Sequence, residues 1–208
     1  EELAVTAGAL GYRALGLADR NSVAGVVRAW KAAETVGVPF HPGARLVFAD
    51  GTPDMLAYPQ DRRGWAHLCR MLTIANERGE KGNPVLLQED LFDWGNRISL
   101  AVLPDLSQDP QKLLTFLRRC RDRFGHAVWL AVAPLHGGDD RFRLALAAEL
   151  AQAASMKLMA VNDVCYHTAE RRQLQDVVTS IRLNTPLSQA GLPRSANAER
   201  HLKLPAEM

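Results

Sequence analysis

The chain has 208 residues, 47% of them hydrophobic, which is typical of one globular domain and leaves little room for two independent cores. The 25 lysine and arginine residues stand against 23 aspartate and glutamate residues, and the formal net charge of +2 excludes a surface that is basic all over. No apolar run approaches the roughly 18 residues needed to cross a bilayer, and Glu1-Glu2 is not the start of a signal peptide. We therefore expect a soluble, cytoplasmic chain with no membrane partner.

Hydrophobic periodicity divides the chain into alternating strands and helices. Apolar residues three and four positions apart, such as Val23, Val26 and Val27, indicate helices, and Ser22 is of a residue type that caps them. The Ala49-Asp50-Gly51 sequence supplies the turn between two neighbouring strands. In chain order we predict a helix over 3–10, a strand over 12–18, a helix over 22–36, strands over 38–48 and 55–58, a helix over 62–78, a strand over 98–103, a helix over 110–124, a strand over 127–133, a helix over 141–155, a strand over 158–161 and a helix over 170–182.

The repeated strand–helix units predict an α/β fold. Its sheet should be mainly parallel and covered by helices, as either a barrel or an open doubly wound sheet. No glycine-rich phosphate loop and no Gly-x-Gly-x-x-Gly sequence follows a predicted strand. The commonest nucleotide-binding α/β folds therefore lose their main support.

Polar residues gather where predicted strands end, which is where functional residues lie in folds of this kind. The four segments concerned are 18–22, 41–45, 135–140 and 162–167. Carboxylate and imidazole groups are the side-chain types that bind Mn²⁺ or Zn²⁺. In these segments they occur at Asp19, His136, Asp163 and His167.

Each of these residues also has an ordinary structural explanation. Asp19 precedes a predicted helix and can cap it, and Asp163 can order its own turn through an Asx hydrogen bond. His136 and His167 fit surface or packing positions. Cys165 fits a small core residue better than a nucleophile, because no adjacent base is evident. The residue types alone leave both explanations open.

Two groups of basic residues fall on predicted helices. The first group is Arg118, Arg119, Arg121 and Arg123, and the second is Arg171, Arg172 and Arg182. Either group can meet phosphate or a protein partner, but a solvated helix face is the simpler explanation. With a net charge of +2, we expect any nucleic-acid binding by this chain alone to be weak and salt-sensitive.

Several longer motifs stand out along the chain. They are Ala18-Asp19-Arg20-Asn21-Ser22, Gly43-Ala44-Arg45-Leu46, Asn162-Asp163-Val164-Cys165-Tyr166-His167 and Asn197-Ala198-Glu199-Arg200-His201. With these motifs the chain resembles the polymerase-and-histidinol-phosphatase (PHP) domain of bacterial C-family DNA polymerases, and more narrowly that of the error-prone alpha-subunit paralogue. The resemblance spans essentially the whole chain, and its C-terminal part is the most specific.

The resemblance implies a distorted (β/α)7 barrel of the PHP type. In active relatives a metal cluster lies at the C-terminal ends of the strands. Those relatives begin with a His-x-His pair on the first strand, and this chain starts in the helix that follows, so that strand is expected to be absent. Residues 1–208 are then a fragment of one PHP domain, which stops before the polymerase palm and its catalytic carboxylates.

The resemblance can be followed position by position. At two positions where active relatives have a metal ligand, this chain has an arginine. Where those relatives have Asp-His after the second strand, the chain keeps Asp19 and has Arg20, and where they have Gly-x-Glu it has Gly43-Ala44-Arg45. A family histidine falls near Asp54. A guanidinium has no lone pair for a metal ion and is not deprotonated in proteins, so both arginines argue against a working cluster.

The later positions keep part of the ligand set. His136 matches a late histidine position and Asp163 is retained, but the second member of the Asp-x-His pair is Cys165. The resemblance therefore implies a degenerate site made of Asp19, Arg20, Arg45, Asp54, His136, Asp163 and Cys165. Asp19, His136 and Asp163 remain as candidate metal ligands, and we expect no bound cofactor and no catalytic residue in this fragment.

The first functional hypothesis is a metal-free, non-catalytic barrel that supports an error-prone, translesion DNA polymerase or docks its partners. Arg20 and Arg45 would replace metal ions electrostatically and pair with Asp19, Asp54 or Asp163. The parent polymerase, a DNA-directed nucleotidyltransferase of DNA repair and replication, is then the enzyme. The expected partners are the remainder of the polymerase chain, DNA bound through that chain, and replication or mutagenesis accessory proteins.

Two other hypotheses assign catalysis to the chain itself. A metal-dependent phosphoesterase or 3′–5′ proofreading exonuclease would use Mn²⁺ or Zn²⁺ to activate water against a phosphodiester. An unrelated small-molecule barrel enzyme would use Cys165 or His167, but it leaves the resemblance unexplained. Bound metal and hydrolysis would separate the exonuclease from the metal-free support.

Overall fold

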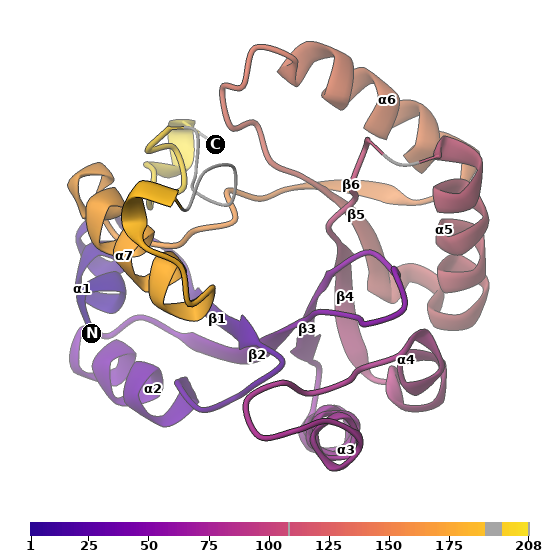
Figure 1. Ribbon diagram of the computed structural model, residues 1–208, viewed down its shortest axis with the longest axis horizontal. Helices are drawn as coiled ribbons and strands as arrows, with labels where there is room; N and C mark the ends of the chain where they lie inside the picture. Colours follow the sequence, from indigo (N-terminus) through magenta and orange to yellow (C-terminus); the bar gives the residue numbers. More distant parts are fainter. Residues whose placement is uncertain (108, 190–196, 208) are drawn as a thin grey trace.

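A computed structural model of the chain describes residues 1–107, 109–189 and 197–207. Strands and helices alternate, with the helices outside a curved sheet (Figure 1). The strands are β1 (Leu15–Arg20), β2 (Phe40–Leu46), β3 (Met55–Pro59), β4 (Ile98–Val102), β5 (Val128–Val132) and β6 (Lys157–Ala160). The helices are α1 (Glu2–Ala9), α2 (Val26–Thr35), α3 (Arg62–Arg78), α4 (Gln88–Trp94), α5 (Pro110–Phe124), α6 (Asp140–Ala153) and α7 (Arg172–Arg182). Short 3₁₀ helices are η1 (Gly125–Ala127), η2 (Ala169–Arg171), η3 (Leu187–Gln189) and η4 (Pro205–Glu207).

Within the described residues, six strands form one mixed sheet in the order β1-β2-β3-β4-β5-β6. The β1–β2, β4–β5 and β5–β6 pairs are parallel, and the β2–β3 and β3–β4 pairs are antiparallel. This order never reverses, so the doubly wound alternative is wrong. No ladder joins β1 to β6 in the described part of the chain, and the expected barrel is not confirmed.

Helix boundaries agree with the sequence where a local signal marks them. The predicted helices over 62–78 and 110–124 match α3 and α5 at both ends. Asp61 accepts a hydrogen bond from the Gly64 N–H, and Asp109 accepts one from Gln111 with Pro110 at the first helical position. The helix predicted over 22–36 begins later, at Val26, because Ser22 accepts from the Ala24 N–H in a turn instead of capping the helix.

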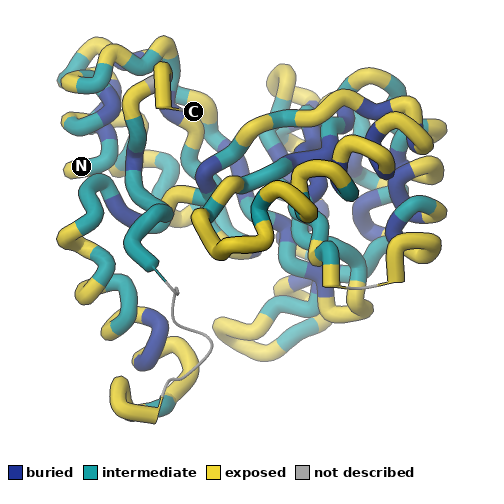
Figure 2. The backbone as a smooth tube through the Cα atoms, turned by 90° about the horizontal axis from the view of Figure 1, so that it is seen from above, coloured by how far each residue is buried: buried dark blue, intermediate teal, exposed yellow. Residues whose placement is uncertain are grey.

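Two hydrophobic clusters hold the described elements together (Figure 2). The larger lies between the sheet and helices α3, α5 and α6, and Leu46, Leu100 and Leu117 in it are fully buried. Burying each such side chain contributes about 1.5–3 kcal/mol. The smaller cluster joins α1, β1 and α2 to Leu202, near the other end of the chain. None of the described helices combines the length and apolar character that a membrane span needs.

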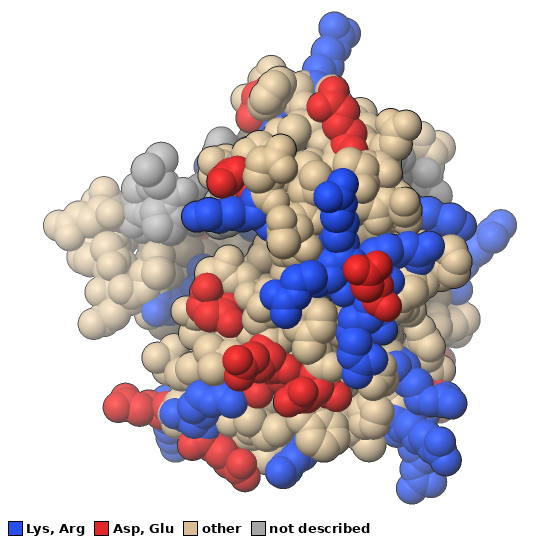
Figure 3. Space-filling view, turned by 90° about the vertical axis from the view of Figure 1, so that its right-hand side faces the viewer, with Lys and Arg blue, Asp and Glu red and all other residues tan. Residues whose placement is uncertain are grey.

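The arginines of α5 contact neighbouring elements of the fold. Arg118 donates from Nε to the carbonyl oxygen of Ala153 at 3.3 Å, and the Arg119 guanidinium lies 4.8 Å from the centre of the Phe92 ring. Arg123 donates from Nη1 to the side-chain oxygen of Asn96 at 2.7 Å. Both basic and acidic side chains lie on this side of the molecule (Figure 3). Packing against α4 and α6 therefore accounts for three of the four arginines on this helix.

Candidate functional site

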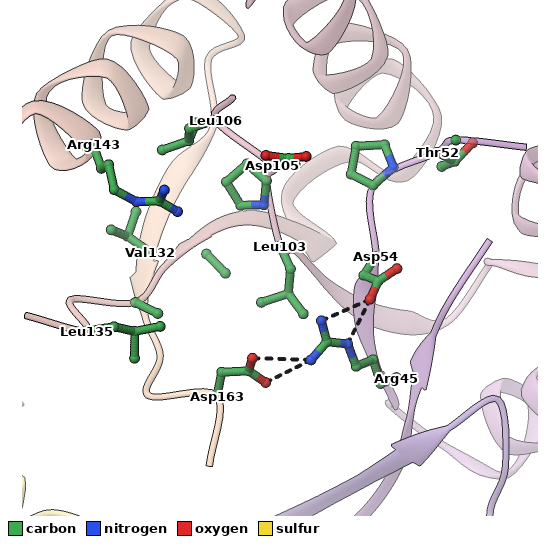
Figure 4. Close-up of a pocket in the computed structure, with 15 residues that line it drawn as sticks. Arg45, Thr52, Asp54, Leu103, Asp105, Leu106, Val132, Leu135, Arg143 and Asp163 are labelled. Carbon is green, nitrogen blue, oxygen red and sulfur yellow. Dashed lines mark hydrogen bonds and ion pairs between the residues drawn. The ribbon is translucent and has the colours of Figure 1, made fainter. Parts of the chain in front are cut away.

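The candidate site lies where β2, β4, β5 and β6 end and β3 begins (Figure 4). A cavity of about 430 Å³ opens there. Its polar lining includes Arg45 of β2, Asp54 beside the start of β3, and Asp163 in the loop after β6. Although 118 positions separate Arg45 from Asp163 in the sequence, the sheet brings their side chains together. The cavity therefore joins three of the predicted site residues.

Arg45 binds both carboxylates of this cavity. Its Nε and Nη2 each lie 2.9 Å from Oδ2 of Asp54. Its Nη1 lies 2.9 Å from Oδ1 and 3.2 Å from Oδ2 of Asp163. One planar guanidinium thus donates to two carboxylates on separate segments, a geometry that the point charge of a lysine does not reproduce.

The three side chains are largely shielded from water. The exposed fraction is 21% for Arg45 and 24% for both Asp54 and Asp163. Burial alone would lower the pKa of Arg45, but the charges of Asp163 and Asp54 outweigh it and raise the pKa above its ordinary value. Shielded pairs are screened less than exposed ones, so loss of Arg45 would leave two poorly solvated carboxylates facing one another.

The glycine before Arg45 has a packing function. A Cβ at Gly43 would lie 2.5 Å from Cδ1 of Tyr58 and 2.7 Å from the carbonyl oxygen of Ala57. Only glycine lets β3 and the Tyr58 ring come this close to β2. In the Gly43-Ala44-Arg45 motif, the glycine therefore permits close packing of β2 against β3, and the arginine binds the carboxylates of the cavity.

Arg200 is a second cation on Asp163. Its Nη2 lies 2.5 Å from Oδ2 of Asp163, and its Nε donates to the Asp163 carbonyl oxygen at 2.9 Å. Asn162 donates to the carbonyl oxygens of Glu199 and His201, which holds the segment 197–204 against the loop after β6. Arg200 is absent from the predicted site, and its place in the 197–201 motif is the one sequence signal that points to it.

Three loop residues after strands have left-handed backbone angles. The φ values are +44° for Asn21 after β1, +52° for His136 after β5 and +43° for Asp163 after β6. Asn, Asp and His are the non-glycine types that most readily adopt this conformation. The backbone therefore accounts for part of the polar character that marked these loops in the sequence.

Arg20 is linked more weakly than Arg45. Its Nη1 lies 4.0 Å from Oδ2 of Asp54, and its side chain is 50% exposed. Burial lowers the pKa of Arg20, and repulsion from Arg182 and Arg45 adds to this, against the attraction of Asp54. Exposed ion pairs contribute about 0–1 kcal/mol. Arg45 is therefore the main cation of the cavity.

Asp19 lies outside the charged cluster and stabilises the start of α2. Its Oδ2 accepts a hydrogen bond of 2.9 Å from the N–H of Gly25, the residue that precedes the helix. Of the two explanations that the sequence left open for Asp19, metal ligand and helix cap, this contact supports the helix cap.

Replacing Asp19 by alanine is expected to lower the free energy of unfolding by about 1 kcal/mol, because the Gly25 N–H loses its acceptor. Urea unfolding followed by circular dichroism measures this. Asp19→Asn, which keeps an acceptor, should lose less, and the exposed Glu34→Ala on the same helix should change stability by less than about 0.5 kcal/mol. Equal stability of Asp19→Ala and wild type would contradict the capping role.

The predicted histidines and Cys165 make other contacts. The His136 side chain is 68% exposed, with Nε2 3.8 Å from Oε2 of Glu199. His167 lies with Nδ1 3.4 Å from Oε2 of Glu2. Burial raises the pKa of the Cys165 thiol, so this residue is a poor nucleophile.

The side chains at the cavity do not fit a metal centre. In the part of the chain that the structure describes, no three His, Cys, Asp or Glu residues are grouped so that they could hold a metal ion. Asp19 and His136, two of the three candidate ligands, bind elsewhere. Asp54 and Asp163 instead share the Arg45 guanidinium, whose nitrogens donate hydrogen bonds and offer no lone pair.

Comparison with known proteins gives relatives but no family model. No protein-family model matches the chain. A solved structure described as a metal-dependent phosphoesterase of Bifidobacterium adolescentis aligns with 76% of this chain and 79% of its own, at 16% identity and a TM-score of 0.49. That score is too low for any conclusion about fold or function.

The curated relatives share one description. Over its full length the chain is 60% identical to an error-prone DNA polymerase of Mesorhizobium japonicum and 48% identical to one of Sinorhizobium medicae. It is 43% identical to an error-prone DNA polymerase of Caulobacter vibrioides. The chain spans 19% of the length of each of these proteins. From end to end, it is similar to about one fifth of an error-prone DNA polymerase.

Proposed function

We propose that the chain is the PHP domain of an error-prone DNA polymerase and serves that polymerase as a metal-free structural module. The observation that carries the proposal is the position of Arg45. Its guanidinium lies between Asp54 and Asp163 and pairs with both, and Arg200 on Asp163 supplies the second positive charge that balances the two carboxylates.

Charge alternation supports a structural role. Asp54, Arg45, Asp163 and Arg200 form a row in which each residue contacts a neighbour of opposite sign. The row ties the end of β2, the start of β3, the loop after β6 and the segment 197–204 to one another. We infer that this row takes the place of the metal cluster of active PHP domains, and that the curved sheet is the wall of a PHP-type barrel.

The length of the relatives leaves room for the chemistry outside the part that this chain matches. Relatives about five times as long carry the name error-prone DNA polymerase, and this chain aligns with only a fifth of them. In our proposal, translesion nucleotide addition and DNA binding belong to the remainder of the polymerase. The PHP domain supports the fold of that remainder and offers surfaces to its partners.

A phosphoesterase or 3′–5′ exonuclease is the competing function. The cavity favours it, because the lining includes Arg45 and Arg143, which are suited to contact phosphate. Against it, a metal-bound water needs carboxylate or imidazole ligands with free lone pairs. Here the positively charged guanidinium of Arg45 lies between Asp54 and Asp163, and its charge repels a metal ion from the position between them.

Metal analysis of the complete polymerase tests the proposal. Plasma mass spectrometry on unchelated protein should find no stoichiometric Mn or Zn that depends on Asp163. A phosphodiesterase assay with added Mn²⁺ or Zn²⁺ should show no hydrolysis that Asp163→Ala removes, while primer extension should be present. Asp122→Ala, an exposed carboxylate on α5, is the matched control. Stoichiometric metal with hydrolysis lost in Asp163→Ala but kept in Asp122→Ala would establish the exonuclease instead.

A further inference from the structure

Helix α7 carries a stripe of exposed apolar side chains. Leu174, Val177, Val178 and Ile181 follow the i, i+3, i+4, i+7 spacing that places side chains on one helix face. Their exposed fractions are 53%, 42%, 50% and 74%. We refer to these four residues as the apolar face of α7.

The opposite side of α7 is polar and is the side that is buried. Thr179 and Ser180 are 6% and 7% exposed. The helix therefore has the reverse of the usual orientation, in which apolar residues face the core. Among the described elements, α7 has its substantial contacts with η2 and η3, its neighbours in sequence. In Figure 2 the residues that lead into the grey trace of 190–196 project from the body of the molecule.

This orientation leaves the helix without the packing that normally stabilises it. An isolated helix of 11 residues is marginal in water, and helices of proteins depend on burial of their apolar face. Other exposed apolar residues occur as short groups, such as Val27 with Trp30 and Phe142 with Leu144, and not as a stripe over two turns. A continuous apolar patch of this kind marks an interaction site.

The surroundings of α7 are also incomplete in their hydrogen bonds. The Ser180 hydroxyl on α7 and the Tyr166 hydroxyl are buried, and neither has a hydrogen-bond partner among the described residues. Tyr166 lines a recess of about 210 Å³ together with Leu174 and Val178 of the apolar face. Buried hydroxyls without partners are rare in complete structures. The unpaired Tyr166 hydroxyl thus lies beside the apolar face, whereas Ser180 lies on the opposite side of the helix.

We propose that the apolar face of α7 docks into an apolar groove on the remainder of the polymerase chain. This rests on the proposed function, because the relatives place about four fifths of a polymerase in the same polypeptide. A covalently attached partner is present at a high effective concentration, so it occupies such a face before a separate molecule does. The mode is a helix seated in a groove, with anchors at the four apolar positions.

Cysteine labelling of the complete polymerase chain tests the docking. Ile181→Cys is compared with Phe142→Cys, because the two positions have matching exposed fractions of 74% and 68% here. Maleimide labelling, quantified on the peptide by mass spectrometry, should be slower at position 181 by at least about tenfold, as for a site that reacts only after local opening. The protection should not change on dilution, because the partner is in the same chain.

Three outcomes decide the matter. Equal labelling rates at positions 181 and 142 would overturn the docking, and so would protection at 181 that disappears on dilution, which would identify a second copy as the occupant. Leu174→Cys repeats the comparison if Ile181→Cys disturbs folding, as judged by circular dichroism. Fast labelling in a polymerase that lacks metal-dependent hydrolysis would reject the docking and leave the proposed function standing.

Discussion

Replacing Arg45 by methionine is expected to lower the free energy of unfolding by about 3 kcal/mol, because the shielded carboxylate of Asp54 loses its close cation and Asp163 keeps only Arg200. Methionine keeps the length and apolar stem of the side chain but removes all donors to Asp54 and Asp163. The two carboxylates, each 24% exposed, then face one another without a cation between them. This loss of stability is larger than the loss caused by removing an exposed ion pair, because the remaining carboxylates are shielded from water.

Urea unfolding of the wild type, Arg45→Met, Asp163→Asn and the double variant measures this effect. Residues in one charge network are coupled, so the double variant should be more stable than the sum of the two single losses predicts, by about 1–2 kcal/mol. Arg28→Met, at an exposed position of α2, is the matched control and should change stability by less than about 0.5 kcal/mol. Additive losses would show that Arg45 and Asp163 do not stabilise the fold as a pair.

Replacing Asp90 by asparagine is expected to cost about 2 kcal/mol at neutral pH, because the carboxylate accepts charge-assisted hydrogen bonds in a buried position. Its two oxygens accept hydrogen bonds from Nη1 and Nη2 of Arg78 at 2.7 and 3.0 Å. One of these oxygens also accepts a hydrogen bond from the N–H of Leu87 at 2.9 Å. Burial by itself would raise the pKa of Asp90, but the Arg78 and Leu87 hydrogen bonds outweigh it and hold the pKa below its ordinary value of 3.8.

The sign of the pH dependence follows from this lowered pKa. The pKa of Asp90 in the unfolded chain is taken as the ordinary value of 3.8. The stability that Asp90 contributes is fully present above this pH, and it is lost as the pH falls through the lower pKa of the folded state. The difference between wild type and Asp90→Asn should therefore be constant near neutral pH and shrink below about pH 4. Asp93→Asn, exposed on the same helix, should show no such change. A difference that is the same at all pH values would refute the role of the ionised carboxylate.

Helices whose ends are marked by a local capping signal can be predicted from the sequence. A helix that is held by a contact outside its own segment cannot. Asp61 and the Asp109-Pro110 pair mark α3 and α5 because a cap acts over three residues. The seven-residue helix α4 was not predicted, since Asp90 in its first turn is held by Arg78, a residue of the preceding helix. Such a contact has no periodic signature in the sequence.

The candidate site shows the same division. The resemblance directed attention to Arg45, Asp54 and Asp163, and the sheet does bring these three together. The sequence marked Asp19 and His136 as candidates in the same way, but their side chains do not join these three. Asp19 accepts a hydrogen bond at the start of α2, and His136 is exposed at a turn. Residue type indicated chemistry, but backbone geometry decided which side chains meet.

The contact between the two ends of the described chain affects how the domain folds during synthesis. The Tyr12 hydroxyl donates to the carbonyl oxygen of Lys203, 191 positions later, and Leu202 completes the cluster that contains Ala4 and Ala7. At a translation rate of about 5–20 residues per second, roughly 10–40 s pass between synthesis of these partners. During that interval the cluster formed by α1, β1 and α2 lacks Leu202. Its packing is therefore completed only after nearly all of the described chain has been synthesised.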